Sequence, residues 1–275
     1  MKSVTLLLCM VSSLMSAVVA AEAYRGLLHD AHIHYDQDVW QDLSPDEAVE
    51  LLQQSGIGHA SVSATPTQGA AMLQRAAPDR VVAMLRPYKS WRHRYLWFRD
   101  PGLDAYLREH LAAAPYRGFG EFHVFGEDMT TPQVRAMVAL ARERGLVLLA
   151  HTDLAGMRHL LAMSDSVVVL WAHGGFDVPL EVLRELLQRY PQLHIELSLR
   201  EGLLDADDRL QPAWQQLFSE YPSRFLVGMD TYKPSRWAQL PELVETTREW
   251  LGQLPQDVAA ALAWQNFDRL LLQQR

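Results

Sequence analysis

The sequence predicts a single-domain (β/α)8 TIM barrel of the α/β class. Short apolar runs alternate with amphipathic stretches along most of the 275 residues, which is typical of parallel strands joined by helices. The alternation repeats eight times within about 250 residues, the usual length of such a barrel. No Ser/Gly-rich linker or change of composition divides the chain. An open doubly wound sheet is the alternative, but no G-x-G-x-x-G motif follows the first strand.

Eight runs are predicted as strands. Most of them are continuous apolar segments, as expected of parallel strands that are buried on both faces. The eight runs are Leu28–His34, Ile57–Ser63, Arg80–Arg86, Tyr116–His123, Leu146–His151, Val167–His173, Leu193–Ser198 and Phe225–Asp230.

The helices between the strands carry recognisable boundary signals. Ser44-Pro45-Asp46-Glu47 combines an N-cap serine, a proline at the first helical position and a capping-box glutamate, and Gly56 is placed to end that helix. Thr131-Pro132 repeats the start signal, and Gly145 ends the helix that follows. Further helices are expected at about Leu103–Ala113, Val178–Tyr190, Asp208–Tyr221, Arg236–Leu251 and Gln256–Gln273.

Residues 1–23 have the pattern of a secretory signal peptide, so the barrel domain is expected to cover 24–275. Lys2 precedes a mostly apolar run, Val4–Val11, and Ala21-Glu22-Ala23 fits a cleavage site. An uncleaved anchor or a buried first helix is the alternative. A cleaved signal predicts a periplasmic or secreted protein that is not attached to a membrane.

Composition narrows the classes of function. Hydrophobic residues make up 49% and charged residues 21% of the chain, which are globular proportions. The net charge of −8 argues against sequence-independent binding of nucleic acid, so a small-molecule substrate is the expected partner. The only cysteine, Cys9, lies in the predicted signal peptide. Any metal ion in the mature chain must therefore be held by His and carboxylate side chains. The oligomeric state stays open.

Ionisable residues interrupt the apolar runs where several strands end. In His32-Ile33-His34 the two imidazoles are two residues apart on a strand, so they point to the same side. A barrel brings the ends of different strands to one place, where unpaired buried charges would be costly. A divalent metal ion accounts for such a cluster. The strand-end residues are His32, His34, Glu121, His151, His173 and Asp230.

The order of these residues resembles the amidohydrolase superfamily, and within it the amidohydrolase-related (amidohydrolase 2) branch. The similar segments begin at His29-Asp30-Ala31-His32 and continue to the end of the mature chain; the later ones are 172–175, 228–231 and 266–271. The resemblance implies a metal-dependent TIM-barrel hydrolase, most often of amide or ester bonds. Some members of the branch decarboxylate or hydrate their substrates instead.

The resemblance also implies roles for the strand-end residues. His32, His34 and His151 would be metal ligands. Asp230 would bind metal and transfer the proton, and His173 would bind a second ion or polarise the substrate.

Glu121 stands where many relatives have a carboxylated lysine that bridges two ions. It could bridge two ions, bind one or support a ligand. The implied cofactor is one or two divalent metal ions, with zinc the expected metal.

Further polar residues are expected near the barrel mouth. Asp30 shares the facing of His32 but lies deeper on the strand, which favours an acceptor that orients a ligand imidazole. A buried acid with backbone partners is the alternative. The long connection from Pro87 to Pro101 interleaves aromatic and cationic residues and would lie on the C-terminal face. The candidates for substrate contact are Arg86, Trp91, His123 and Glu196, each with a structural role as the alternative.

The leading hypothesis is a hydrolase in which a metal-activated water attacks an amide, ester or lactone-type bond. Asp230 would accept the proton of that water, and His173 or Arg86 would stabilise the oxyanion. A single-metal decarboxylase or lyase of the same branch is the first alternative. A non-catalytic periplasmic binding barrel is the second. A nucleic-acid hydrolase is disfavoured by the net charge of −8.

Overall fold

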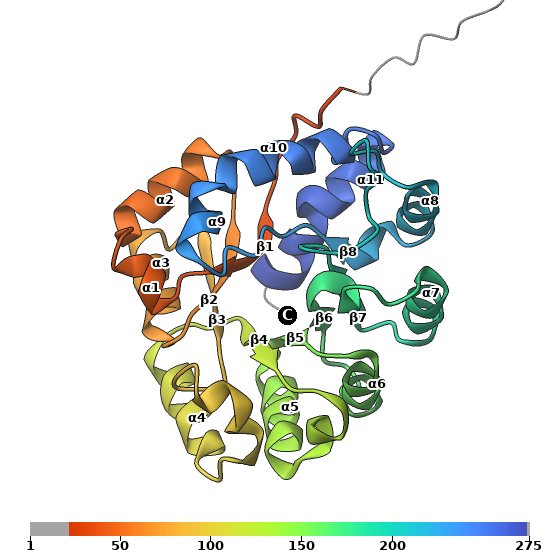
Figure 1. The fold of residues 1–275 in the computed structure, drawn as a ribbon. Helices are drawn as coiled ribbons and strands as arrows, with labels where there is room; N and C mark the ends of the chain where they lie inside the picture. Colours follow the sequence, from red (N-terminus) through yellow and green to blue (C-terminus); the bar gives the residue numbers. More distant parts are fainter. Residues whose placement is uncertain (1–21, 274–275) are drawn as a thin grey trace, which may run out of the picture.

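The barrel is closed by hydrogen bonds between its first strand and the segment after its last. The structure is a computed structural model that describes residues 22–273. Eight parallel strands follow one another in chain order, and the helices lie around them (Figure 1). The Ala31 amide donates to Val227 O at 3.0 Å, and the Asp230 amide donates to His32 O at 2.7 Å. The predicted TIM-barrel fold is thereby confirmed for the described residues.

All eight predicted strands are present, each within its predicted run. The strands are β1 Asp30–His34, β2 Ala60–Ser63, β3 Val81–Leu85, β4 Gly118–His123, β5 Val147–His151, β6 Val169–Trp171, β7 Leu193–Glu196 and β8 Phe225–Leu226. β3 ends one residue earlier than predicted, at Leu85, and the last three strands end two or more residues earlier. His173 and Asp230 therefore lie just beyond β6 and β8, with φ angles of 59° and 47°.

Helices cover the outside of the barrel. The helices are α1 Gln37–Trp40, α2 Pro45–Gln54, α3 Gln68–Ala76, α4 Leu103–Ala113, α5 Pro132–Arg144, α6 Leu154–Met163, α7 Leu180–Arg189, α8 Pro212–Glu220, α9 Pro234–Ala238, α10 Leu240–Leu251 and α11 Gln256–Ala260. The capping box of α2 forms as predicted, with Ser44 and Glu47 bonding each other's backbone amides. Gly145 ends α5 in the left-handed conformation with a φ of 62°.

Three of the predicted helices differ in detail. The helix expected over Asp208–Tyr221 begins four residues later, at Pro212. The helix expected over Arg236–Leu251 is split into α9 and α10, because Pro241 lacks an amide hydrogen and disfavours a helical residue before it. The helix expected to run to Gln273 continues after α11 as π-helical turns at Ala261–Gln265 and Asp268–Leu272. Helices α1, α3 and α6 were not predicted, although the N-cap residue Asp153 of α6 was an available start signal.

The lower half of the barrel interior is apolar, which confines the polar residues to the opposite end. Side chains such as Ala31, Val82 and Leu149 pack there against Phe267 and Leu270 of the C-terminal segment, whose last turns lie across the barrel centre in Figure 1. This packing leaves the carboxyl ends of the strands as the place where buried ionisable groups gather.

Residues 1–21, which include most of the predicted signal peptide, lie outside the described residues. Between residues 22 and 273, no helix combines the length and the apolar character needed to cross a membrane.

Candidate metal and catalytic site

Four predicted ligand residues meet at the carboxyl ends of β1, β4 and β8. The two histidines of β1 point the same way, as predicted, and their Nε2 atoms lie 3.1 Å apart. Nε2 of His34 is 3.1 Å from Oδ1 of Asp230 and 3.3 Å from Oε2 of Glu121. Nε2 of His32 is 3.5 Å from Oε1 of Glu121. These atoms are close enough to share one metal ion.

The two remaining histidines approach the other side of Glu121. Nδ1 of His151, at the end of β5, lies 2.8 Å from Oε1 of Glu121. Nε2 of His173 lies 3.5 Å from the same oxygen. Oε1 of Glu121 therefore faces His32, His151 and His173, and Oε2 faces His34, so this one carboxylate contacts both histidine pairs.

Glu196, from β7, orients the imidazole of His32. Its Oε2 lies 2.7 Å from Nδ1 of His32, and both side chains are fully buried. A carboxylate can only accept, so this contact keeps the proton on Nδ1 and leaves Nε2 free to bind a metal ion. Gly228 packs closely against both side chains. A Cβ added there would lie 2.4 Å from Oε1 of Glu196 and 2.8 Å from Cβ of His32.

Asp30 does not orient an imidazole, contrary to the sequence-based expectation. Its Oδ1 accepts hydrogen bonds from the backbone amides of His32 and Met229, at 2.9 and 3.0 Å. Burial raises the pKa of Asp30 to about 8. The alternative, a buried acid with backbone partners, is the one that the structure shows, and Asp30 helps to join β1 to the segment after β8.

The remaining carboxyl groups of the cluster carry negative charge. Burial alone would raise the pKa of Glu121, but His123 and His32 and hydrogen bonds from His151 and His173 hold it well below its usual range. The pKa of Asp230 is lowered in the same way, mainly by His32 and His34 against the effect of burial.

The pKa of Glu196 is also lowered: burial opposes this, and the charge of His32 outweighs it. Conversely, although burial alone would lower it, the pKa of His32 is raised well above its usual value by Glu196, Asp230 and Glu121. A proton on His32 and a bound metal ion would each offset the negative charge of these carboxylates, so the two would compete for this site.

The residues present therefore fit a divalent metal ion. Oδ1 of Asp230 is buried and has no hydrogen-bond partner within residues 22–273, as expected of an oxygen kept for a cation. His32 and Glu121 also offer ligand atoms without rearrangement. His34 can bind a metal ion through Nε2 only when its Nδ1 carries the proton. Nη2 of Arg86, which is a donor, lies 2.7 Å from that Nδ1. This contact must therefore change before His34 binds metal.

Arg86 lies at the wall of the site with its donors already used. Nε donates to Glu121 O at 3.2 Å, and Nη1 donates to Thr65 and Asp36 at 2.8 and 3.1 Å. Nη2 contacts His34 and, at 3.4 Å, Oε2 of Glu121. This cation thus ties β3 to β1 and β4 and positions two of the predicted ligands.

A cavity of about 250 Å³ opens above the cluster. Three of the four predicted contact residues line it, namely Arg86, Trp91 and His123. The fourth, Glu196, is fully buried beneath the ligands and supports His32. The whole lining consists of His34, Arg86, Trp91, Arg94, Glu121, His123, His151, His173, Phe176, Leu199, Asp230 and Tyr232.

Sequence reasoning did not single out four of the lining residues, which are Arg94, Phe176, Leu199 and Tyr232. Arg94 belongs to the long loop that the sequence placed at the barrel mouth, and its aromatic and cationic neighbours were the available signal. The others stand a few residues beyond their strands, in loops that carry no motif.

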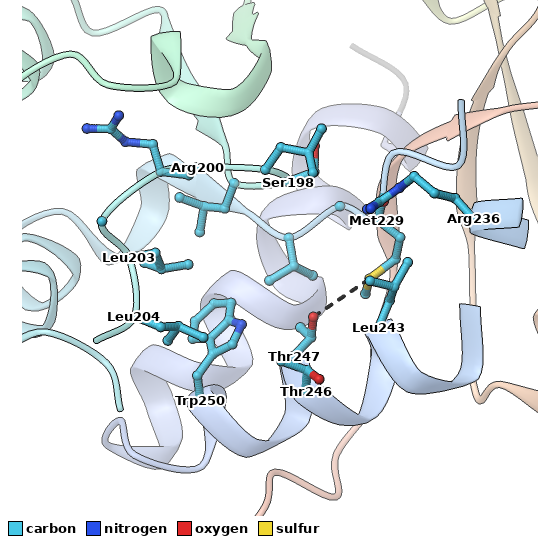
Figure 2. Close-up of a pocket in the computed structure, with 15 residues that line it drawn as sticks. Ser198, Arg200, Leu203, Leu204, Met229, Arg236, Leu243, Thr246, Thr247 and Trp250 are labelled. Atoms are coloured by element: carbon cyan, nitrogen blue, oxygen red, sulfur yellow. Dashed lines mark hydrogen bonds between the residues drawn. The ribbon is translucent and has the colours of Figure 1, made fainter. Parts of the chain in front are cut away.

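A second cavity, of about 350 Å³, lies behind the site between α10 and the segments that follow β7 and β8 (Figure 2). Arg236 donates from this side to Asp230 O and Met229 O, at 2.8 and 2.6 Å. Thr247 contacts the Met229 sulfur at 3.7 Å, shown as the dashed line in Figure 2. The guanidinium of Arg200 points away from the other lining residues (Figure 2). The polar contacts here hold the backbone that carries Asp230.

Comparisons with known proteins bear on the fold. No protein-family model and no curated protein matches the sequence. Among solved structures, an amidohydrolase from Burkholderia multivorans with bound zinc has a TM-score of 0.55 and 18% identity, and the match covers 90% of this chain and 100% of that one. A protein described as a 2-pyrone-4,6-dicarboxylic acid hydrolase, from Pseudomonas putida, has a TM-score of 0.61 and 16% identity over 89% and 97% of the two chains.

A third solved structure has the same described activity and comes from Acinetobacter baumannii with citric acid bound. Its TM-score is 0.61 and its identity 12%, over 90% of this chain and 100% of that one. At these identities the likenesses establish a shared fold. The chain is thus similar in architecture to several amidohydrolases and hydrolases.

Proposed function

We propose that the protein is a metal-dependent hydrolase that cleaves an amide, ester or lactone-type bond in a small molecule. The observation that carries the proposal is the meeting of ligand atoms from three strand ends. Nε2 of His34 lies within 3.3 Å of Nε2 of His32, Oε2 of Glu121 and Oδ1 of Asp230. The fold shared with an amidohydrolase that holds zinc supports the proposal.

The donor set suits zinc, which binds imidazole nitrogen and carboxylate oxygen. His32, His34 and Asp230 would hold one ion, His151 and His173 would hold a second, and Glu121 would reach both. A bound ion would supply Lewis-acid activation of water, lowering the pKa of that water toward about 7.

In this proposal Asp230 takes the proton from the attacking water. Its Oδ1 is buried, free of hydrogen bonds within the described chain and turned toward His34 at 3.1 Å. Its backbone is fixed by Arg236 from behind and by His32 O from the side. A base held in one position can receive the proton and pass it to the leaving group.

With one ion bound, His173 is placed to stabilise negative charge on the substrate oxygen. Its Nδ1 donates to Ser198 O at 2.9 Å, which directs Nε2 toward the cavity. Burial would lower the pKa of His173, but the hydrogen bond to Glu121 and the charge of Glu196 raise it. An imidazolium there donates to the oxyanion. Arg86, whose donors are held by protein acceptors, is less suited to this role.

Elemental analysis of the protein purified without chelator tests the metal site. We expect one or two equivalents of zinc per chain, lost in the double variant His32→Ala, His34→Ala. His159→Ala is the matched control, because that side chain contacts Glu127 on the surface. A protein that binds no metal after reconstitution with zinc, manganese and cobalt would refute the proposal and favour a non-catalytic binding barrel.

Product analysis separates hydrolysis from decarboxylation. A hydrolase incorporates one oxygen from ¹⁸O-labelled water into its acid product, whereas a decarboxylase releases carbon dioxide and incorporates none. Turnover of 4-nitrophenyl esters and of simple lactones in labelled water is the first screen. Carbon dioxide release without label would establish the alternative.

The N-terminal sequence supports the further proposal that the protein is exported. Edman sequencing of the mature chain from the periplasmic fraction should begin near Tyr24. An intact Met1 on the functional protein would contradict cleavage.

A further inference from the structure

Arg94 is a cation at the mouth of the catalytic cavity without an acidic partner. It lies in the connection between β3 and α4 and lines the cavity that contains His34 and Asp230. Its Nη2 donates to the Tyr95 hydroxyl at 2.5 Å. Its Nε is buried without a hydrogen-bond partner, and no carboxylate between residues 22 and 273 pairs with it. Because Arg94 lines the cavity and its Nη1 has no acceptor among the described residues, this end of the guanidinium is available to a ligand.

Two nearby arginines, unlike Arg94, have carboxylate partners within the protein. Arg99, five residues along the same loop, pairs with Asp128 at 2.6 Å. Arg86, on the same cavity wall, is held by Asp36 at 3.1 Å and by four further acceptors. Arg94 has neither arrangement, although the protein carries a net charge of −8 and an acidic partner would be easy to supply.

The guanidinium groups of Arg94 and Arg86 both contact the Trp91 ring. Cζ of Arg94 is 4.8 Å from the ring centroid, and Cζ of Arg86 is 5.2 Å from it. The two guanidinium groups are therefore within about 10 Å of each other, the sum of those distances. Arg86 in turn contacts His34 at 2.7 Å. A ligand bound to Arg94 thus lies within about 10 Å of a guanidinium that contacts a predicted metal ligand.

The rim around the cavity is unusually apolar for exposed surface. Trp91, Phe125, Leu199 and Tyr232 come from four different loops and are 41–49% exposed. Large side chains left exposed together mark a surface that contacts a ligand. Three of them, Trp91, Leu199 and Tyr232, also line the cavity itself.

We infer that Arg94 and Trp91 form a subsite for the carboxylate of an amphiphilic organic acid, whose apolar body lies on the rim and whose scissile bond reaches the metal ligands. The inference rests on the proposed hydrolase function and adds the substrate class to it. Arg94 supplies a planar pair of donors that matches a carboxylate, and Trp91 holds that plane in place. The charge of Arg94, which no carboxylate of the described residues offsets, gains an anionic partner when the acid binds.

Calorimetric titration of the purified holoprotein tests the subsite without requiring turnover. The probes are isophthalate and 3-carbamoylbenzoate, which share one carboxylate for the metal centre and differ only in the charge of the second group. We expect the wild type to bind isophthalate about 10-fold more tightly or better, since charge-assisted hydrogen bonds are the stronger kind. The preference should disappear in Arg94→Gln and be partly kept in Arg94→Lys.

Arg92→Gln is the matched control, because it removes the same charge from an exposed position in the same loop that does not line the cavity. It should retain the wild-type preference. Equal binding of the two probes by the wild type, or an unchanged preference in Arg94→Gln, would overturn the inference. Circular dichroism of each variant checks that the fold is kept.

Comparing kcat/KM for two esters separates this inference from the proposed function. The substrates are the 4-nitrophenyl monoester of glutaric acid and the corresponding ester of glutaramic acid. If kcat/KM is equal for both in the wild type, the acid subsite is refuted while hydrolysis stands. If neither ester, nor any other ester, amide or lactone, is cleaved, the hydrolase proposal fails whatever the titrations show.

Discussion

Replacing Glu196 by glutamine should weaken metal binding although Glu196 is itself not placed to touch the metal. Its Oε2 accepts from Nδ1 of His32 at 2.7 Å and from the Ser198 hydroxyl at 2.9 Å, and its Oε1 accepts from the Ser198 amide at 2.5 Å. Glutamine keeps the shape but replaces one acceptor oxygen by a donor. With that NH2 group toward His32, the imidazole must accept at Nδ1, so its proton moves to Nε2 and blocks the ligand atom.

The size of the effect follows from these contacts. With the NH2 group toward His32, the backbone amide of His173, which donates to Oε2 at 3.2 Å, loses its acceptor. With the NH2 group turned the other way, the Ser198 amide loses its acceptor, so either orientation leaves a buried donor unsatisfied. An unsatisfied buried donor costs about 1–3 kcal/mol of unfolding free energy. Loss of a carboxylate that orients a metal-bound imidazole lowers metal affinity by about 10–100-fold. We expect both losses in Glu196→Gln.

Competition with a chromophoric zinc chelator measures the affinity, and urea unfolding of the metal-free protein measures the stability. Glu201→Gln is the control, because that exposed side chain does not line the cavity and lies in the same segment after β7. If Glu196→Gln binds zinc as tightly as the wild type and the Glu201 variant, the orienting role of Glu196 is refuted. Lower stability with unchanged affinity would leave Glu196 a structural role only.

Three other outcomes are expected. Asp230→Asn should keep its fold and most of its metal, measured by circular dichroism and elemental analysis, but lose turnover by about 100-fold or more; unchanged turnover would exclude Asp230 as the base. Removing the metal with chelator should lower the unfolding free energy by about 4 kcal/mol relative to protein with free metal at 1,000 times its dissociation constant. A chelator that leaves the urea midpoint unchanged would show that the native site holds no metal. Burial and the neighbouring His59 lower the pKa of His29, so the unfolded chain binds more protons there and stability falls as pH drops through about 6.5. The fall between pH 7.5 and 5.5 should be smaller in His29→Gln, and an equal fall in both proteins would refute this.

The strands and the metal-ligand candidates could be predicted from the sequence for one physical reason. A parallel strand buried on both faces is a continuous apolar run, so a polar residue at its end stands out, as His151 does after Val147–Ala150. Because side chains alternate between the two faces of a strand, the sequence also predicted that His32 and His34 point the same way. Their Nε2 atoms lie 3.1 Å apart. Both arguments need only local sequence and the known closure of a barrel.

The relative depth of residues on different strands could not be predicted from the sequence. Asp30 and Glu196 share the inward facing of their strands, and the sequence favoured Asp30 as the acceptor for an imidazole. In the structure Asp30 accepts from backbone amides and Glu196 accepts from His32. Which acid faces the imidazole depends on the stagger between β1 and β7, strands that are more than 150 residues apart in the chain.

The same limit separates Arg86 from Arg94, two arginines eight residues apart on one cavity wall. From the sequence, both are cations close to a strand end. Their chemistry differs because Arg86 enters the barrel, where Asp36, Thr65 and Glu121 saturate its donors. Arg94 stays above it, donates only to the Tyr95 hydroxyl and pairs with no carboxylate of the described residues. A saturated guanidinium can only hold its neighbours in place, and an unsaturated one gains energy from an incoming anion. The count of acceptors around each guanidinium, which only the fold supplies, therefore decides which arginine positions the site and which one selects the substrate.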